Sequence, residues 1–262
     1  MASYRLVDVP LDLFVVSFGL QWAAARTAVR LRSRKETPDD ADSSDFETAR
    51  SVAFTLLAVI IGFTLSMSVS RFDQRKSCEE AEANAIGTEF SRLELLPTET
   101  TAAGQALLRD YLRLRLDFFS GQDPQASERL NVETERARTK LWGVVARAAT
   151  SQPTPVAALA IAGMNEVIDS QGLTIAAWRN RLPLAGWGLT VFIAIGASFL
   201  FGFGASRNSA ATIWVLPLSI SIAFLLIAEI DSPSSGFVRV QPLNLLSAAK
   251  TIGADLEVIP TN

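Results

Sequence analysis

Residues 51–70 read SVAFTLLAVIIGFTLSMSVS and contain no charged residue. A helix needs roughly 20 mostly apolar residues to cross a hydrocarbon layer about 30 Å thick. This stretch meets that requirement, and arginines stand directly beside it at Arg50 and Arg71. The sequence therefore predicts a membrane-spanning helix over residues 49–70, around which the rest of the chain can be placed.

Two more uncharged stretches follow later in the chain. One runs from Leu182 to Ala205 and includes GLTVFIAIGASFLFGFG, and the other runs from Asn208 to Ala228 and includes IWVLPLSISIAFLLIA. Only Arg207 carries a charge between them. We expect residues 182–230 to form a transmembrane hairpin, because each stretch is long enough to span a bilayer.

A shorter apolar run, LFVVSFGLQWAAA, lies near the N-terminus between Asp12 and Arg26. It either spans the bilayer with its charged ends extended to the surface, or lies in the interface. A third interpretation is a cleaved signal peptide, because Ala23 and Ala25 give a small-x-small site. We expect it to span, as the weakest of four transmembrane helices.

The composition argues against most soluble functions. Hydrophobic residues make up 49% of the chain and charged residues 19%, against about 25% charged in soluble domains. The net charge of −3 gives no sign of nucleic-acid binding. The chain has no histidine and a single cysteine, Cys78, so the commonest general base and the thiolate zinc sites are missing. We expect no enzyme activity, cofactor or metal site.

The region between the second and third apolar segments is predicted to be helical and outside the membrane. Apolar residues recur there at helical spacing, and no alternating strand pattern is present. Pro97 and the turn sequence at 121–124 should separate successive helices, and Thr154 with Pro155 should begin another. These apolar stripes are typical of a helical bundle core, with a partner-binding groove as the alternative.

The sequence thus predicts an all-α integral membrane protein with a helical extramembrane domain between its second and third spans. In chain order we expect an N-terminal hydrophobic helix with a basic flank (1–35), an acidic loop (36–48), the second transmembrane helix (49–70), the helical domain (71–181), the hairpin (182–230) and a C-terminal tail (231–262).

Basic residues flanking the spans indicate the orientation of a multi-pass protein in the cell membrane, since Lys and Arg prefer the cytoplasmic side. The flanks of the second and third segments place residues 71–181 in the cytoplasm. The basic run from Arg26 to Lys35 argues for the opposite side, if the first segment spans. We favour a cytoplasmic helical domain.

One face of the second transmembrane helix carries small and polar residues. At 100° per residue its members lie within about 80° of one another; they include Ser51, Thr55, Gly62 and Ser66. Such a stripe either permits close packing of helices in lipid or lines a water-filled ion pathway. We therefore treat these four residues as candidates for an ion pathway.

Charged residues gather where the second and last membrane helices end. They are Arg71, Asp73, Arg75, Glu229 and Asp231. One interpretation is a cluster of ion pairs that holds the helices together. The other is an electrostatic vestibule in which Arg71 and Arg75 attract anions.

Several strings in the chain resemble the bestrophin-like domain of bacterial membrane proteins. They are GFTLSMSVSRFDQR, EANAIGTEF, LELLP, RDYLRLRLDFF, LWGVVARAA, PTPVAALAIAGMNEVID, RNRLP and SGFVRV, within residues 46–241. Ser70, Phe72 and Asp73 are similar to a Ser-aromatic-Asp pattern after the second helix of true bestrophins. Gln74 and Arg75 stand where those proteins have an aromatic pair.

This resemblance implies a four-helix membrane architecture and, through the true bestrophins, a homo-oligomeric anion channel. The calcium-binding acidic cluster of the animal channels has no counterpart in this sequence. We therefore expect a homo-oligomer in the lipid bilayer that conducts anions such as chloride along its second helix. The alternative is a non-conducting scaffold or sensor whose cytoplasmic helices bind a protein partner.

Overall fold

The computed structural model describes residues 9–32, 40–121, 124–205, 212–233 and 237–254. Its helices are α1 (Pro10–Arg32), α2 (Asp40–Leu93), α3 (Thr98–Ser120), α4 (Pro124–Ser151), α5 (Pro155–Arg179), α6 (Leu184–Gly204), the 3-10 helix η2 (Thr212–Trp214), α7 (Val215–Asp231) and α8 (Leu243–Thr251). The described residues contain no strand. The predicted all-α fold class is therefore confirmed.

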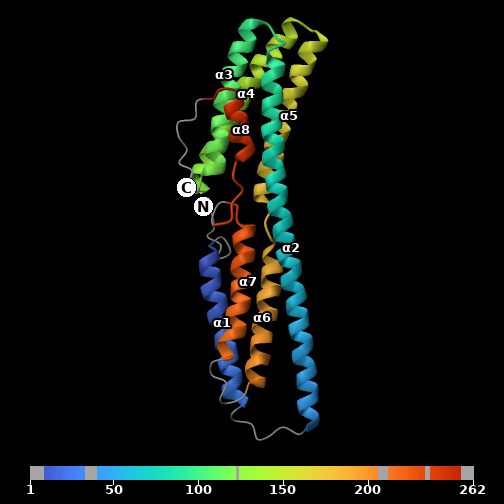
Figure 1. Cartoon of the computed structure of the whole chain (residues 1–262), viewed down its shortest axis with the longest axis vertical. Helices are drawn as coiled ribbons and strands as arrows, with labels where there is room; N and C mark the ends of the chain where they lie inside the picture. Colours follow the sequence, from blue (N-terminus) through green and yellow to red (C-terminus); the bar gives the residue numbers. More distant parts are fainter. Residues whose placement is uncertain (1–8, 33–39, 122–123, 206–211, 234–236, 255–262) are drawn as a thin grey trace. The chain divides into compact units, whose positions relative to one another are not determined.

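The chain divides into two compact units, and α2 contributes to both of them (Figure 1). Unit 1 consists of Met1–Arg71 and Arg181–Val238, so it contains α1, α6 and α7. Unit 2 consists of Phe72–Asn180 and Arg239–Asn262. Each unit is therefore assembled from two separate pieces of the chain.

In unit 1, α1 packs directly against both α6 and α7. The closest approach is at Gly202 of α6, where an added Cβ would lie 2.2 Å from the carbonyl oxygen of Ala25 on α1. A side chain cannot be accommodated there without moving the backbone. Gly202 therefore allows the two helices to approach more closely than any larger residue would.

Polar side chains connect the same three helices inside unit 1. Gln21 of α1 donates from Nε2 to Ser221 of α7 and accepts at Oε1 from Ser198 of α6, both over 3.3 Å. Ser17 donates to Ser221, also over 3.3 Å. All four side chains are buried. Side-chain hydrogen bonds of this kind hold helices together where the surroundings are apolar.

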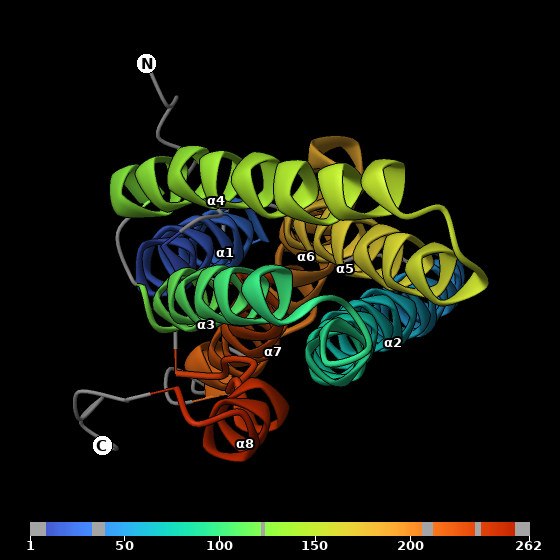
Figure 2. The same ribbon diagram turned by 90° about the horizontal axis from the view of Figure 1, so that it is seen from above.

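Unit 2 has its own core, to which α8 contributes. Figure 2 shows α3 and α4 lying side by side, and these two helices pack against each other along their lengths. The core includes Ile86 of α2, Leu112 of α3, Leu141 of α4, Met164 of α5 and Leu245 of α8. The C-terminal helix is therefore part of this unit, although residues 231–262 were expected to be a tail.

The helix boundaries follow local signals in most places. Helix α2 continues without interruption to Leu93, as expected for a segment that nothing breaks before Pro97. At the start of α5, the Thr154 hydroxyl accepts a hydrogen bond from the N–H of Ala157 over 3.1 Å. The predicted N-cap is therefore confirmed, with Pro155 in the first turn.

The acidic loop predicted over residues 36–48 is wrong for its described part. Helix α2 already begins at Asp40, while residues 36–39 lie outside the described residues. Acidic residues are unfavourable in many helix positions but favourable in the first turns, where they face the positive end of the helix dipole. The acidic run therefore begins the helix instead of separating it from α1.

Two described stretches are long and apolar enough to cross a membrane, judged by length and composition alone. They are Asp45–Leu93, which contains the predicted span 49–70, and Pro155–Gly204, which contains α5 and α6. Between α5 and α6 the chain leaves helical geometry at Asn180. The last apolar helix, α7, is shorter, with 17 residues.

Candidate functional site

The apolar part of α2 has one face turned toward the other helices of unit 1 and one face turned away from them. Leu57 is buried in the core of unit 1, and Ser68 is buried on the same side of the helix. The predicted pathway residues are exposed on the other side; they are Ser51, Thr55, Gly62 and Ser66. We call this exposed side the outward face of α2.

The outward face makes no close contact within the described chain at its centre. A Cβ added at Gly62 would meet no other described atom within 4 Å. The small residue is therefore not explained by packing against another helix of the same subunit. Any close partner of this face must come from lipid, water or another copy of the chain.

Apolar side chains share the outward face with the small polar ones. Val59 is exposed, and Phe63 is 68% exposed. Both lie between Thr55 and Ser66 along the helix. The face is therefore polar at each end of this segment and apolar in the middle.

The charges at the end of the membrane segment point in different directions. Asp73 and Glu80 are exposed on the outward side of α2. Arg75 is 1% exposed on the inward side, and its Nε donates to the carbonyl oxygen of Ala177 in α5 over 3.4 Å. Lys76 is also exposed near the same side of α2, so the outward face presents both acidic and basic groups at this level, while Arg75 is buried within unit 2.

Arg71 and Asp231 form an ion pair in unit 1, with 3.8 Å between Nη1 and Oδ1. The Asp231 carboxylate also accepts the N–H of Leu182 at both oxygens, over 3.0 and 3.3 Å. This carboxylate therefore connects α2, the end of α7 and the residues that precede α6. Arg71 and Asp231 thus form an ion pair that joins two helices.

Glu229 contributes in a different way from the other predicted exit residues. Its Oε2 accepts the backbone N–H of Phe237 over 2.6 Å, which fastens the segment after α7. Asp73, by contrast, stays exposed. The five predicted residues therefore do not form one cluster. Arg71 pairs with Asp231, Arg75 and Glu229 each contact backbone elsewhere, and Asp73 is exposed.

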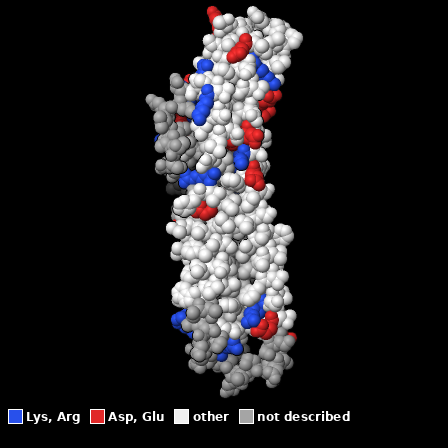
Figure 3. All heavy atoms as spheres, viewed as in Figure 1, with Lys and Arg blue, Asp and Glu red and all other residues white. Residues whose placement is uncertain are grey.

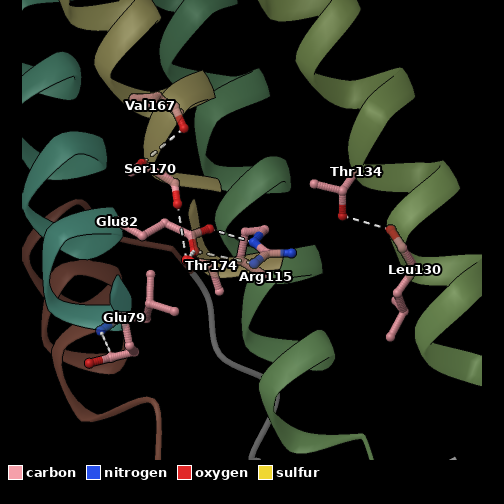
Figure 4. Close-up of polar contacts among 9 residues, drawn as sticks. Glu79, Glu82, Arg115, Leu130, Thr134, Val167, Ser170 and Thr174 are labelled. Carbon is pink, nitrogen blue, oxygen red and sulfur yellow. Dashed lines mark hydrogen bonds and ion pairs between the residues drawn. The ribbon is translucent and has the colours of Figure 1, made fainter. Parts of the chain in front are cut away.

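A buried polar network in unit 2 escaped the sequence analysis. Figure 4 shows Glu82 of α2, Arg115 of α3 and Thr174 of α5 pointing toward one another. Arg115 forms an ion pair with Glu82 through Nε and a second bond through Nη2 over 3.2 Å. The Thr174 hydroxyl donates to Glu82 over 2.8 Å.

The charge state of this network follows from its geometry. Burial lowers the pKa of the Arg115 guanidinium, whereas the charge and hydrogen bond of Glu82 and the charge of Tyr111 raise it, so that the pKa lies above its ordinary value. The guanidinium is therefore held in its charged form. One signal was present in the sequence, because Arg115 lies on an otherwise apolar helical stripe where only a paired charge is tolerated.

A second buried carboxyl group lies where α2 approaches α5. Glu89 is fully buried, and neither of its carboxyl oxygens has a hydrogen-bond partner among the described residues. A Cβ at Gly163 of α5 would lie 2.0 Å from Glu89 Oε2. Burial raises the pKa of Glu89 to about 8, which Arg92 partly opposes and Glu166 reinforces. Arg92 itself pairs with Glu166 over 3.1 Å.

Helix α8 is held at both ends by charged side chains of unit 2. Glu79 of α2 accepts from the backbone N–H of Leu245 over 2.8 Å and from Asn244 Nδ2 over 2.7 Å. At the other end, Arg109 of α3 donates to the carbonyl oxygen of Ile252 over 2.8 Å. A carboxylate at the N-terminus and a cation at the C-terminus both complement the helix dipole.

The family model of the bestrophin-like domain matches residues 13–245 of this chain. The chain belongs to the bestrophin-like family. The match covers α1 to the beginning of α8, so both units are part of the family domain. The resemblance expected from the sequence strings is therefore confirmed, and the chain is a bestrophin-like membrane protein.

Solved structures of the same fold cover nearly the whole chain. A point variant of a bestrophin homologue from Klebsiella pneumoniae is 16% identical, with a TM-score of 0.63 over 92% of this chain and 94% of that one. Another structure of the Klebsiella homologue is 18% identical, with a TM-score of 0.62 over 91% and 95%. A variant described as a membrane protein has 15% identity and a TM-score of 0.64 over 91% and 98%.

These likenesses extend to the fold of the chain, since the identities are low. No curated protein sequence matches the chain. Within the described residues no group of three or more carboxylate or thiol side chains could hold a metal ion. The outward face of α2 and its surroundings are the features of this chain that bear on its function.

Proposed function

We propose that the chain is one subunit of a homo-oligomeric ion channel in the cell membrane, with a pathway lined by the outward face of α2. The observation that carries this proposal is the exposure of small polar residues on a membrane helix that has its own apolar core contacts on the other side. A hydroxyl group facing lipid can only return a hydrogen bond to its own helix, as Thr55 does to the carbonyl oxygen of Ser51 over 2.9 Å. Hydroxyl groups facing a water-filled path can in addition replace part of an ion's hydration.

The pathway requires several copies of the chain. In one subunit the outward face of α2 is open, with no described atom opposite Gly62. Copies arranged around an axis would turn these faces toward one another and enclose a pore. Val59 and Phe63 would then form an apolar constriction, which can close a pore by excluding water.

The membrane topology belongs to the same proposal. Four helices cross the bilayer in it, namely α1, the unit 1 part of α2, α6 and α7, and residues 71–181 lie on the cytoplasmic side. The hydrogen bonds of Gln21 to α6 and α7 support a spanning α1, because they require α1 to lie beside those helices. Labelling of single cysteines placed at residues 35 and 120 tests this topology, and equal labelling from both sides of the membrane would contradict it.

Two considerations favour different permeant ions. The family resemblance implies anions. On the outward side of α2, however, two exposed carboxylates, Asp73 and Glu80, outnumber the one exposed cation near them, Lys76. Arg75 is buried. Rings of carboxylates favour cations. The reversal potential under a salt gradient decides between the two, because its sign identifies the permeant ion.

The decisive experiment is ion flux through liposomes that contain the purified protein. We expect flux in the unmodified protein and its loss in Gly62→Trp and Ser66→Trp, because bulky rings would fill the pathway. Gly196→Trp is the matched control, since Gly196 lies on α6 and also has open space around it. A monomer that carries no flux would overturn the proposal. Such a result, together with a protein partner bound by unit 2, would support a scaffold instead.

A further inference from the structure

Aromatic residues on α1 form a ladder that ends in an arginine. Phe14, Phe18, Trp22 and Arg26 follow one another at intervals of four residues. The rings of Phe14 and Phe18 stack with 6.2 Å between centroids. The Arg26 guanidinium carbon lies 5.3 Å from the centre of the Trp22 ring, a cation–π contact. Consecutive members of the ladder are therefore neighbours on the helix surface.

A fourth aromatic residue completes the cluster from another part of the chain. Trp214 of η2 lies 5.7 Å from Phe18 and 5.2 Å from Trp22, measured between ring centroids. Trp214 and Arg26 are both exposed. The cluster therefore offers an exposed tryptophan ring, a partly exposed one whose Nε1 is buried, and a cation together at the surface of unit 1.

The ladder lies at the boundary between apolar and charged surface. No charged residue occurs on α1 between Asp12 and Arg26, and Leu20 beside the ladder is exposed. Figure 3 shows largely uncharged surface over the unit 1 helices, with both basic and acidic side chains below it. Tryptophan is enriched at this level in membrane proteins because its ring is apolar and its N–H is polar.

Arg26 differs in its role from the nearby Arg32. Arg32 donates to the carbonyl oxygen of Phe203, over 2.8 Å, and so neutralises the end of α6. The Arg26 guanidinium lies over the face of Trp22, which leaves the edge of the guanidinium plane, with its N–H groups, to bind an oxyanion. A phosphate group is well matched to that edge.

We propose that this aromatic and basic surface of α1 and η2 binds the headgroup of an anionic phospholipid. Arg26 contacts the phosphate, and Trp22 and Trp214 lie beside the glycerol region. Charge complementarity and continuity with the apolar surface of unit 1 support a lipid as the occupant. The inference rests on the proposed insertion of unit 1 into a membrane.

Tryptophan fluorescence in vesicles tests this proposal. The purified full chain is reconstituted into mixtures of phosphatidylcholine and phosphatidylglycerol, with bromine on the acyl chains of one lipid at a time. We expect brominated phosphatidylglycerol to quench more strongly than brominated phosphatidylcholine at equal mole fraction. The preference should correspond to about a fivefold higher local affinity, as one basic residue near a lipid surface provides.

Substitutions test whether Arg26 causes the preference for phosphatidylglycerol. Arg26→Gln should abolish the preference while leaving quenching by brominated phosphatidylcholine unchanged, and Arg26→Lys should keep most of it. Arg113→Gln, an exposed arginine of α3 in unit 2, is the matched control and should behave as the unmodified chain. Trp22→Phe with Trp214→Phe should remove the difference between the two lipids.

Two outcomes would overturn the lipid site. One is equal quenching by both brominated lipids in the unmodified chain, and the other is a preference that survives Arg26→Gln. Absence of quenching by either lipid has another meaning, because it shows that unit 1 is not in the bilayer. That outcome would contradict the proposed membrane function together with the lipid site.

Discussion

The Glu82 carboxylate and the Arg115 guanidinium form an ion pair in which neither side chain is exposed to solvent. The two residues come from α2 and α3, and Thr174 adds a hydrogen bond from α5. Three helices of unit 2 are thus joined at one point. Replacing both members of such a buried pair by apolar residues changes the stability of a protein little. Removing one partner lowers the stability strongly, because the other charge is left buried and unpaired.

Replacement of Arg115 by Met should destabilise the protein by about 3–5 kcal/mol, because it leaves Glu82 buried without its cation. Chemical unfolding in detergent, followed by the fluorescence of Trp178, measures this change. Arg113→Met is the control and should cost no more than about 1 kcal/mol, since its pair with Asp110 is exposed. Equal effects of the two substitutions would contradict the prediction.

Glu89 should make the stability of the protein fall as the pH rises from about 4.5 to about 8. In the unfolded chain this carboxyl loses its proton near its ordinary pKa of 4.5, whereas in the folded chain burial raises the pKa to about 8. Between these values the folded state holds the extra proton, so rising pH favours unfolding. Thermal unfolding of Glu89→Gln across this range should show a flatter profile. An unchanged slope would show that Glu89 does not titrate in this way.

Gly202→Val should weaken the packing of α1 against α6. The new side chain would meet the backbone of Ala25, which cannot move away as a flexible side chain could. Overpacking of this kind costs about 1–3 kcal/mol or more. Gly196→Val on the same helix is the control, because an added Cβ there meets open space. The difference between their melting temperatures in detergent measures the effect.

If the proposed channel conducts, Asp73→Asn should shift its ion selectivity toward anions. The substitution removes an exposed carboxylate from the outward side of α2 without changing its size. The reversal potential in a potassium chloride gradient measures the shift. Glu166→Gln is the control, since that carboxylate lies on α5 and pairs with Arg92. A reversal potential that does not change in Asp73→Asn would remove Asp73 from the pathway.

Local signals in the sequence were sufficient for the helices themselves. The uncharged segment of α2, the break before Pro97 and the cap at Thr154 depend only on neighbouring residues, and all three are found. The start of α2 at Asp40 was missed because an acidic run suits either a loop or the first turn of a helix. Composition alone does not separate those two states.

The polar contacts inside the units could not be predicted, because they join residues far apart in the chain. Glu82 is 33 residues from Arg115 and 92 from Thr174. The periodicity of each helix gives its buried side but not the helix that covers it. The sequence therefore indicated that Arg115 lies on a core stripe, and the structure was needed to supply its partner.

The same reasoning applies to the candidate pathway. The pattern along α2 placed Ser51, Thr55, Gly62 and Ser66 on one face, and left open whether that face packs against another helix. The structure shows this face exposed within the subunit. In an assembled oligomer, the neighbours of this face depend on how other copies of the chain are arranged. The residue pattern within one helix does not specify that arrangement.

The attachment of α8 by Glu79 and Arg109 has a consequence for biosynthesis. Chains emerge from the ribosome N-terminal end first, and domains tend to fold in that order. Unit 2, however, needs Leu245 in its core, and Leu245 is made only after α6 and α7. The helices α2 to α5 therefore keep an apolar surface uncovered until α6, α7 and Leu245 have been synthesised. Unit 2 can therefore be completed only after translation has passed both α6 and α7.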